Sequence, residues 1–239
     1  MPAAHDTPEL SVVIPVFNEE AILEVALRAL LAKLDRSGWR YELLLAENGS
    51  RDRTRQIAAA LAANAPHLRV LHDDQPNYGR ALRRGIESAR GRWVVCDEID
   101  LGDMAFYQRA VALLARGADM VVGSKRHPQS IDARPWIRRR GTQVINGLLR
   151  LSVGFTGTDT HGLKAFDRGR LLPIVSQCVV EHDLFASELV VRAMRAGLDV
   201  REIPLALREI RPPSVGLARR VPRVLGNLAR LVYAIRRRP

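Results

Sequence analysis

The chain has 239 residues, of which 47% are hydrophobic, and it carries a formal net charge of +11. This length suits one sizeable α/β domain, and the composition excludes a disordered chain. Two cysteines, Cys96 and Cys178, are too few for a disulfide framework or a zinc site, and they fit a reducing cytosol. No stretch approaches the roughly 18 uninterrupted apolar residues of a membrane-spanning helix.

The first 123 residues predict strands and helices in alternation. The apolar runs that predict strands are 10–16, 41–46, 68–72, 93–96 and 120–123. The segments with helical spacing of apolar residues are 22–34, 54–64, 80–89 and 104–116. This order is typical of an α/β fold, with a mainly parallel sheet and helices on both faces. Ligands of such sheets bind at the carboxyl ends of the strands.

The pattern changes after Gly123. Basic residues dominate 124–141, a helix is expected to about residue 151, and a loop rich in Gly and Thr follows at 154–162. A short strand at 163–166, a helix at 185–196 and an extended segment at 200–209 complete the expected elements. The sequence predicts a flexible leader (1–9), one domain (10–210) and a basic C-terminal segment (211–239).

Residues 93–103 combine an apolar run with a dense group of acidic side chains. The acidic residues are Asp97, Glu98, Asp100 and Asp103. Glu98 and Asp100 are two positions apart, so in an extended chain both side chains face the same way. Carboxylates at the mouth of a parallel sheet favour a Mg²⁺ or Mn²⁺ ion that would neutralise phosphates. The alternative is a solvated acidic turn that caps the helix beginning near Asp103.

The sequence lacks the usual phosphate-binding and hydrolytic motifs. It contains no G-x-G-x-x-G after the first strand, no P-loop, no H-E-x-x-H and no G-x-S-x-G. A diphosphate would therefore need a metal ion in place of a glycine-rich loop. Three basic residues, Lys125, Arg126 and Arg138, could cradle an anionic second substrate. A solvated basic loop is the alternative interpretation.

Several motifs resemble family 2 glycosyltransferases with the GT-A (Rossmann-like) fold. They are Val12–Glu20, Glu47–Asp52, Asn77–Gly79 and Gly91–Leu101. The later part is similar to polyprenyl-phosphate sugar transferases, a group that includes the dolichyl-phosphate mannose synthases. The segments that carry this second resemblance are Gly123–Lys125, Arg138 with Thr142 and Asn146, Asp159–Phe166, and Glu209–Ser214.

The resemblance implies roles for individual residues. The nucleotide-sugar site would contain Pro15, Phe17, Asn18, Glu19, Glu47, Asn77, Gly79, Glu98 and Asp100. Asp100 and Glu98 would bind the Mg²⁺ or Mn²⁺ ion, and Glu47 could accept a hydrogen bond from a uracil or guanine N–H. The acceptor phosphate would be bound by Lys125, Arg126, Arg138 and Arg211. The catalytic residues would be Asp100, Asp159 and Arg138.

The implied reaction is an in-line displacement at the anomeric carbon, with inversion. A polyprenyl phosphate acceptor is already an anion and needs no general base. A soluble or glycan hydroxyl acceptor does need a base, for which Asp159 and Asp183 are candidates. A third alternative is a nucleic-acid-binding α/β module without catalysis.

The C-terminal segment predicts a basic amphipathic helix. Its apolar face comprises Leu217, Val221, Val224, Leu225, Leu228, Leu231, Val232 and Ile235. Arginines lie on another face, and Tyr233 is the only aromatic residue, which argues against a nucleic acid partner. The pattern predicts peripheral attachment to an anionic membrane surface through 217–238, at the cytoplasmic face of the inner membrane. The alternative is a helix packed on its own domain or on a partner chain. The oligomeric state stays open.

Overall fold

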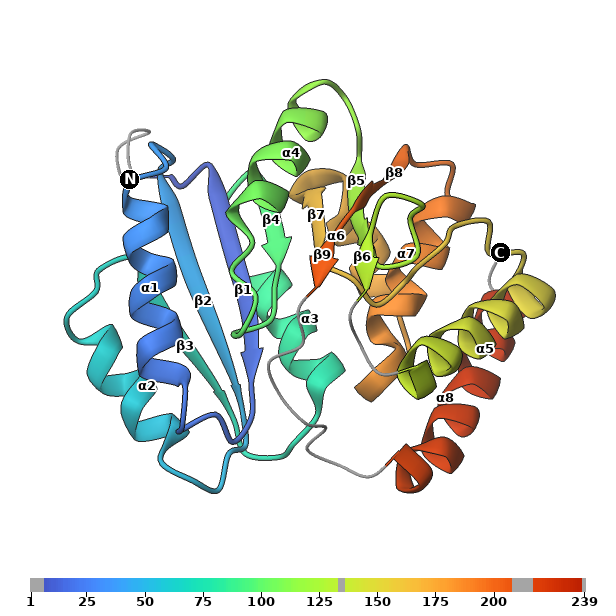
Figure 1. The fold of residues 1–239 in the computed structure, drawn as a ribbon, viewed down its shortest axis with the longest axis horizontal. Helices are drawn as coiled ribbons and strands as arrows, with labels where there is room; N and C mark the ends of the chain where they lie inside the picture. The colour runs from blue at the N-terminus through green and yellow to red at the C-terminus, as the bar shows by residue number, and fades with distance from the viewer. Residues whose placement is uncertain (1–6, 133–135, 208–216, 238–239) are drawn as a thin grey trace.

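The computed structural model describes residues 7–132, 136–207 and 217–237. Its main sheet has seven strands in the order β3-β2-β1-β4-β7-β5-β8 (Figure 1). These strands are β1 (Leu10–Val16), β2 (Tyr41–Asn48), β3 (Leu68–Asp73), β4 (Trp93–Cys96), β5 (Met120–Ser124), β7 (Lys164–Asp167) and β8 (Val200–Pro204). A second, two-stranded sheet pairs β6 (Ile131–Asp132) with β9 (Ala206–Leu207). The predicted α/β fold with a mainly parallel sheet is confirmed.

Helices cover both faces of the main sheet. The helices are α1 (Leu23–Asp35), α2 (Thr54–Ala62), α3 (Tyr78–Ser88), α4 (Met104–Ala115), α5 (Trp136–Val153), α6 (Arg168–Gln177), α7 (Phe185–Arg195) and α8 (Leu217–Arg237), with a 3-10 turn, η1 (His182–Leu184). Residues of α1, α2 and α4 share one apolar core, and residues of α3, α5, α6, α7 and α8 share the other. Neighbouring strand residues alternate between the two cores: Val12 belongs to the first and Val13 to the second.

Strand β7 runs against its neighbours. It pairs antiparallel with both β4 and β5, whereas every other pairing in the main sheet is parallel. The chain leaves β5 at the carboxyl edge, forms α5 beside the sheet and enters β7 from that same edge (Figure 1). The loop at 154–163 is therefore delivered to the edge where the parallel strands end.

Two sequence expectations need revision. Helix α6 was not expected, and it forms around an internal proline, Pro173, with Asp167 capping its start by accepting a hydrogen bond from the Arg170 N–H. Helix α8 forms as predicted, but part of its apolar face packs against the domain: Leu228, Leu231 and Ile235 are buried in the second core. The alternative interpretation of the tail therefore holds for these three residues.

Residues 1–6 of the predicted leader lie outside the described residues. Residues 208–216, which precede α8, lie outside them as well. In the described part of the chain, no helix combines the length and apolar character needed to cross a membrane.

Candidate active site

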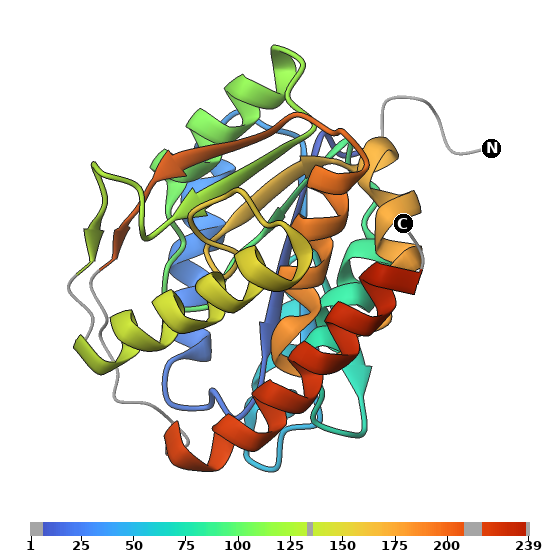
Figure 2. The ribbon, with the colours of Figure 1, turned by 90° about the vertical axis from the view of Figure 1, so that its right-hand side faces the viewer.

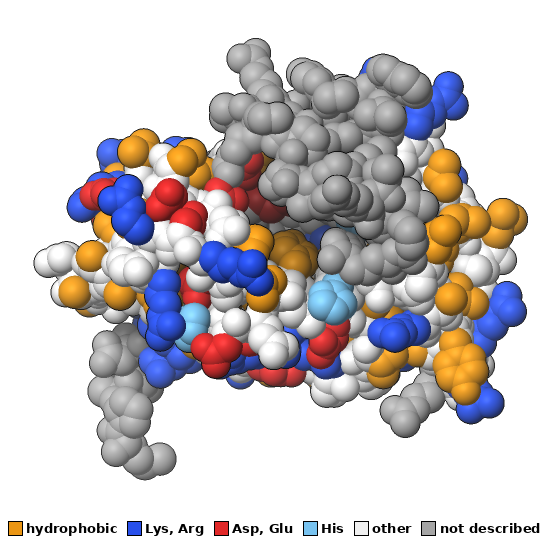
Figure 3. Space-filling view, turned by 90° about the horizontal axis from the view of Figure 1, so that it is seen from below, with side chains coloured by type: hydrophobic (Ala, Val, Ile, Leu, Met, Phe, Trp, Pro, Cys, Tyr) orange, Lys and Arg blue, Asp and Glu red, His pale blue; other side chains and the backbone are white. Residues whose placement is uncertain are grey.

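Six parallel strands end at one edge of the sheet, and their loops gather the predicted site residues there. Figure 3 looks onto this edge and shows acidic, basic and histidine side chains together on it. The loop before β7 arrives at the same edge because β7 is antiparallel. The sequence placed the loops after β1 to β5 here, and the structure adds the Asp159 loop.

The acidic group after β4 begins with a turn. The Leu101 N–H donates a hydrogen bond of 3.0 Å to the Glu98 carbonyl, and Gly102 has a φ of 53°. The expectation that Glu98 and Asp100 project from an extended segment is therefore wrong, because β4 already ends at residue 96 and the chain turns towards α4. Glu98 is exposed and Asp100 is half-buried. Both carboxylates remain within one short turn at the carboxyl edge.

The two other acidic residues of this group stabilise the turn. The Asp103 side chain caps α4 by accepting from the Phe106 N–H at 3.0 Å, which is the cap that the alternative interpretation of the acidic group expected. Asp97 is only 3% exposed and accepts hydrogen bonds from the Glu98 N–H (2.6 Å) and the Tyr107 hydroxyl. Burial raises the pKa of Asp97 to about 7. The group thus divides into two anchoring residues, Asp97 and Asp103, and two residues, Glu98 and Asp100, that lie in the turn at the edge.

The loop after β1 is bonded to the turn after β2. Pro15 pairs with β2 in the parallel ladder, and Phe17, directly after β1, is 39% exposed. Asn18 adopts a φ of 54°. Its side-chain oxygen accepts from the Arg51 N–H at 2.9 Å, and its own N–H donates to Ser50 Oγ at 3.0 Å. The unusual backbone of Asn18 is thereby held by the neighbouring turn.

The next residues along this loop are fixed in the same way. The Glu19 N–H donates to Thr54 Oγ1 at 2.7 Å, and the Glu20 N–H donates to Asp52 at 3.2 Å. Asp52 also accepts from the Thr54 N–H at 3.0 Å. These bonds place the start of α2 and the loop after β1 side by side.

Glu47 is buried at the end of β2 and already has partners for both oxygens. It accepts from the Ser50 N–H at 2.6 Å and from His72 Nδ1 of β3. The other ring nitrogen of His72 lies 3.0 Å from Asp74. His72 therefore links two carboxylates at the predicted base-binding edge. The sequence did not single out His72; its only signal was a histidine at the end of an apolar strand.

Asn77 connects three segments at this edge. Its side-chain oxygen accepts from the Arg80 N–H, which caps α3, and from the His182 N–H at 3.0 Å. Its side-chain nitrogen donates to Glu181 at 2.6 Å, and its own N–H donates to the Asn48 side chain. Asn77 is thus a junction between the loop after β3 and the segment around η1.

Gly79 is required by close packing. A Cβ atom at this position would lie 2.7 Å from the His182 backbone nitrogen and 2.8 Å from its carbonyl oxygen. His182 itself has a φ of 59°, an uncommon conformation for a residue other than glycine. The two predicted nucleotide-site residues Asn77 and Gly79 therefore hold η1 against the first turn of α3.

Asp159 and Lys125 join the loop before β7 to the end of β5. Asp159 is fully buried, and its two oxygens accept from the Lys125 N–H (3.0 Å) and the His161 N–H (2.9 Å). Burial acts to raise the pKa of Asp159, but the Lys125 ammonium and these N–H groups outweigh it and hold that pKa below its usual value. The Lys125 ammonium also donates to the His161 carbonyl at 3.2 Å.

Lys164 is a buried cation that the sequence interpretation overlooked. It lies on β7 opposite Cys96 of β4, and its ammonium donates to the Gly162 carbonyl at 2.7 Å. Burial lowers the pKa of Lys164 to about 8, although the charges of Asp159 and Glu98 act in the opposite direction. A lysine between two apolar residues of a short strand is a sequence signal that could have identified it.

The remaining predicted cations are described only in part. Arg126 lies beside α5, where its guanidinium reaches Gln143 at 2.8 Å when the amide oxygen faces it. Arg138 lies in α5, but its side chain is outside the described residues, as are the Asp183 side chain and all of Arg211. Lys125 and Arg126 are thus the two predicted acceptor-binding residues whose side chains the structure describes.

The donor atoms available for a metal are few. In the described ranges, no three Asp, Glu, His or Cys side chains are placed to hold a metal ion together. Glu98 and Asp100 offer two hard carboxylates, which suit Mg²⁺ or Mn²⁺ if a diphosphate and water supply the remaining oxygen atoms. A metal ion at these two carboxylates would take its remaining ligands from the diphosphate and water.

Polar loops at the carboxyl edge of an α/β sheet are where ligands of such sheets bind. The family model for glycosyl transferase family 2 matches residues 11–168, and the chain belongs to this family. This membership confirms the predicted enzyme class over the alternative of a non-catalytic nucleic-acid-binding module.

Two relatives illustrate the range of similar sequences. Glycosyltransferase AglD of Haloferax volcanii is 35% identical over 205 residues, which cover 82% of this chain and 32% of AglD. Undecaprenyl-phosphate 4-deoxy-4-formamido-L-arabinose transferase of Shewanella sediminis is 32% identical over 189 residues, which cover 72% of this chain and 56% of that enzyme. The chain thus spans about a third to a half of the length of these relatives.

A solved structure shares the fold. Glucosyl-3-phosphoglycerate synthase of Mycobacterium tuberculosis, in complex with Mn²⁺, UDP and glucosyl-3-phosphoglycerate, matches with a TM-score of 0.67 at 20% identity. The match covers 95% of this chain and 78% of that chain. It confirms the GT-A fold.

Proposed function

We propose that this chain transfers a sugar from a nucleotide-sugar to a polyprenyl phosphate, with inversion at the anomeric carbon. The observation that carries this proposal is the state of Asp159, whose two oxygens are both engaged by backbone N–H groups in a fully buried position. A hydroxyl acceptor needs a base, and Asp159, the first of the two candidate bases, is poorly placed to be one. A phosphate acceptor brings its own negative charge and needs cations instead.

The cations of the site support a phosphate acceptor. Lys125 and Arg126 lie at the end of β5, beside the loop that carries Asp159, and Arg138 and Arg211 are proposed to complete the cradle. Asp159 acts as a positioning residue that fixes the backbone at Lys125. The relatives named for undecaprenyl-phosphate transfer point to the same acceptor class.

The donor would bind across the loops after β1, β2 and β4. Pro15, Phe17, Asn18 and Glu19 form one wall, and Glu47 with His72 lies where the base is expected. Asn77 and Gly79 support this wall through η1.

Glu98 and Asp100 are proposed to hold a Mg²⁺ or Mn²⁺ ion together with the diphosphate. A metal bound there would stabilise the charge on the departing nucleoside diphosphate. The crystal structures of glucosyl-3-phosphoglycerate synthase include a complex with Mn²⁺ and UDP-glucose, which makes UDP-glucose a reasonable first donor to test.

The proposed place of action is the cytoplasmic face of the inner membrane, with peripheral attachment through 217–238. The arginines of this segment and the lipid nature of the acceptor support it.

The test is an extraction assay. Purified protein is incubated with radiolabelled UDP-sugars or GDP-sugars, Mn²⁺ and undecaprenyl phosphate, and label is measured in the organic phase. The proposal predicts metal-dependent label in that phase with at least one donor. A soluble acceptor such as 3-phosphoglycerate is the comparison; label that transfers only to it would support the hydroxyl-acceptor alternative.

A further inference from the structure

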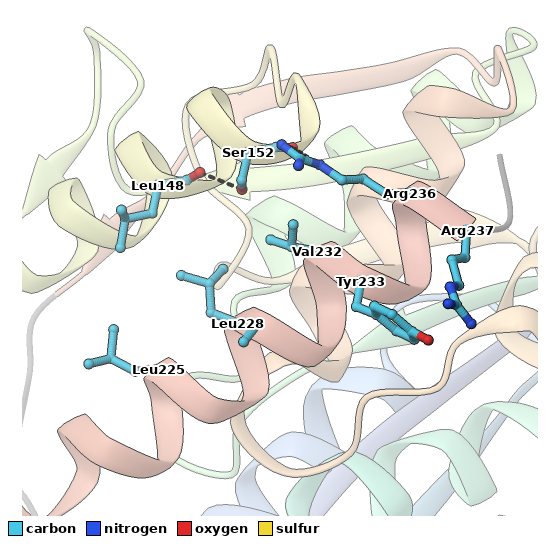
Figure 4. Close-up of a pocket in the computed structure, with 9 residues that line it drawn as sticks. Leu148, Ser152, Leu225, Leu228, Val232, Tyr233, Arg236 and Arg237 are labelled. Atoms are coloured by element: carbon cyan, nitrogen blue, oxygen red, sulfur yellow. Dashed lines mark hydrogen bonds between the residues drawn. The ribbon is translucent and has the colours of Figure 1, made fainter.

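Helices α5 and α8 are far apart in sequence but lie side by side at one end of the molecule (Figure 2). Arg236 of α8 joins them by donating two hydrogen bonds to the Ser152 carbonyl of α5, at 3.2 and 3.3 Å. An open groove runs between the two helices and is lined mainly by apolar side chains (Figure 4). The pair therefore forms one composite surface.

The apolar arc of α8 is divided between this groove and the core. Leu231 and Ile235 are buried in the core, Leu228 and Val232 contact both the core and the groove, and Leu225 and Ala229 line the groove. Leu225 is 51% exposed, and Tyr233, beside this stripe, is 57% exposed. Of the five residues of the predicted apolar face whose side chains are described, Leu225 is therefore exposed and Val232 is half-buried.

Helix α5 contributes a matching stripe. Val144, Leu148 and Leu151 are four and three positions apart, so they share one face of the helix. Leu148 lines the groove, while Val144 is 60% exposed and Leu151 is 87% exposed. The α5 stripe therefore meets the groove at Leu148 and continues on the exposed face of the helix through Val144 and Leu151.

All charged side chains on the two helices are positively charged. The sequence contains no acidic residue between Asp132 and Asp159 and none after Glu209, so both helices lack carboxylates. Arg140, Arg230 and Arg237 are exposed on them, and Arg237 lies over the Tyr233 ring at 4.5 Å. Exposed apolar side chains on two helices whose charged side chains are all basic match the interface of an anionic bilayer, which offers hydrocarbon beneath negative headgroups.

The other side of α5 is bonded to the candidate active site. The Asn146 side chain donates to the Thr158 carbonyl at 2.7 Å, and Arg150 donates to the Gly157 carbonyl at 3.1 Å. Thr158 immediately precedes Asp159, so α5 carries the open apolar stripe on one side and the site loop on the other.

We infer that α5 and α8 together form a docking surface for an anionic lipid bilayer, with α5 contributing as much as the C-terminal helix. This inference extends the proposed attachment through 217–238, which involved α8 alone. Docking through this surface would hold the Asp159 loop at a fixed distance from the membrane.

Co-sedimentation with vesicles tests the role of α5 without any transfer reaction, so its outcome is independent of the proposed activity. The double variant V144D/L151D places two carboxylates on the exposed stripe of α5. Loss of the apolar contacts and of the charge match should weaken binding to vesicles of phosphatidylcholine and phosphatidylglycerol by about tenfold or more. Raised salt should weaken wild-type binding as well.

The matched control is V25D. Val25 is 75% exposed on α1, on the opposite face of the sheet, and this variant should bind vesicles like the wild type. Circular dichroism should show the same folded state for all three proteins. Wild-type binding by V144D/L151D, or an equal loss in V25D, would overturn the inference, as would equal binding of the wild type to pure phosphatidylcholine vesicles.

Discussion

The backbone N–H of Lys125 donates a hydrogen bond of 3.0 Å to Oδ2 of Asp159. This bond joins the end of β5 to a loop that lies 34 positions later in the chain. The second oxygen of Asp159 is engaged by the His161 N–H. The Asp159 carboxylate therefore links its own loop to the end of β5 and fixes the backbone that presents the Lys125 ammonium.

Asp159→Asn tests whether this carboxylate positions the backbone at Lys125 or acts as a general base. The variant keeps one acceptor oxygen, so we expect a higher KM for the acceptor and a loss of about tenfold in kcat/KM, with an unchanged pH profile. Removal of a general base typically costs about 10²–10⁴ in rate. A loss of that size at constant KM, together with disappearance of the acidic limb of the pH profile, would identify Asp159 as the base.

Asp100→Asn tests the acidic turn. We expect transfer to be abolished with the fold intact, because the loss of one of only two proposed carboxylate ligands removes the metal. Asp103→Asn is the matched control: asparagine is also a good cap for α4, so activity should persist. Turnover in the presence of Mn²⁺ and thermal denaturation provide the measurements. Near-normal turnover of Asp100→Asn would contradict the metal assignment.

Lys164→Met tests the buried ammonium through the pH dependence of stability. The folded-state pKa is about 8 and the ordinary value is 10.5, so the unfolded chain binds more protons between these pH values. The free energy of unfolding of the wild type should therefore rise as the pH increases from about 8 to 10.5. Below pH 8 the cost of burying the charge is fully present, at about 3 kcal/mol.

We expect Lys164→Met to be more stable than the wild type at pH 7, by a margin that shrinks towards pH 10. Urea unfolding at both pH values gives this difference. A variant that is less stable by the same amount at each pH would contradict a charge-burial cost.

A pair of glycine substitutions tests the packing of η1. Gly79→Ala places a methyl group 2.7 Å from the His182 backbone nitrogen and should destabilise the protein by about 1–3 kcal/mol, because backbone cannot easily move aside. Gly226→Ala, in α8, meets nothing within 4 Å and should stabilise the helix by up to about 1 kcal/mol. Thermal unfolding of the two variants should therefore shift in opposite directions; equal shifts would refute the contact.

Much of the fold followed from local patterns. The strands β1 to β5 were predictable because each is a short apolar run bounded by a polar turn. Helix α6 was missed because Pro173 interrupts its apolar residues. The direction of β7 depends on where the chain enters the sheet, which no local pattern encodes.

The sequence allowed several residues of the candidate site to be identified, but it did not allow their contacts to be predicted. Glu98 and Asp100 were identified, but the turn that carries them depends on where β4 ends. The partners of Asp159 come from long-range topology. Helical spacing revealed the apolar arc of α8, yet it could not tell that Leu228 faces the core while Leu225 stays open.

The most direct test of the central claim compares undecaprenyl phosphate with undecaprenol as acceptors, with Mn²⁺ and the best nucleotide-sugar donor. The two lipids differ only in the phosphate. The proposed mechanism predicts labelled lipid from the phosphate alone, because the site offers cations for an anionic nucleophile and Asp159 is engaged by backbone N–H groups. Comparable transfer to undecaprenol would contradict it and require a general base.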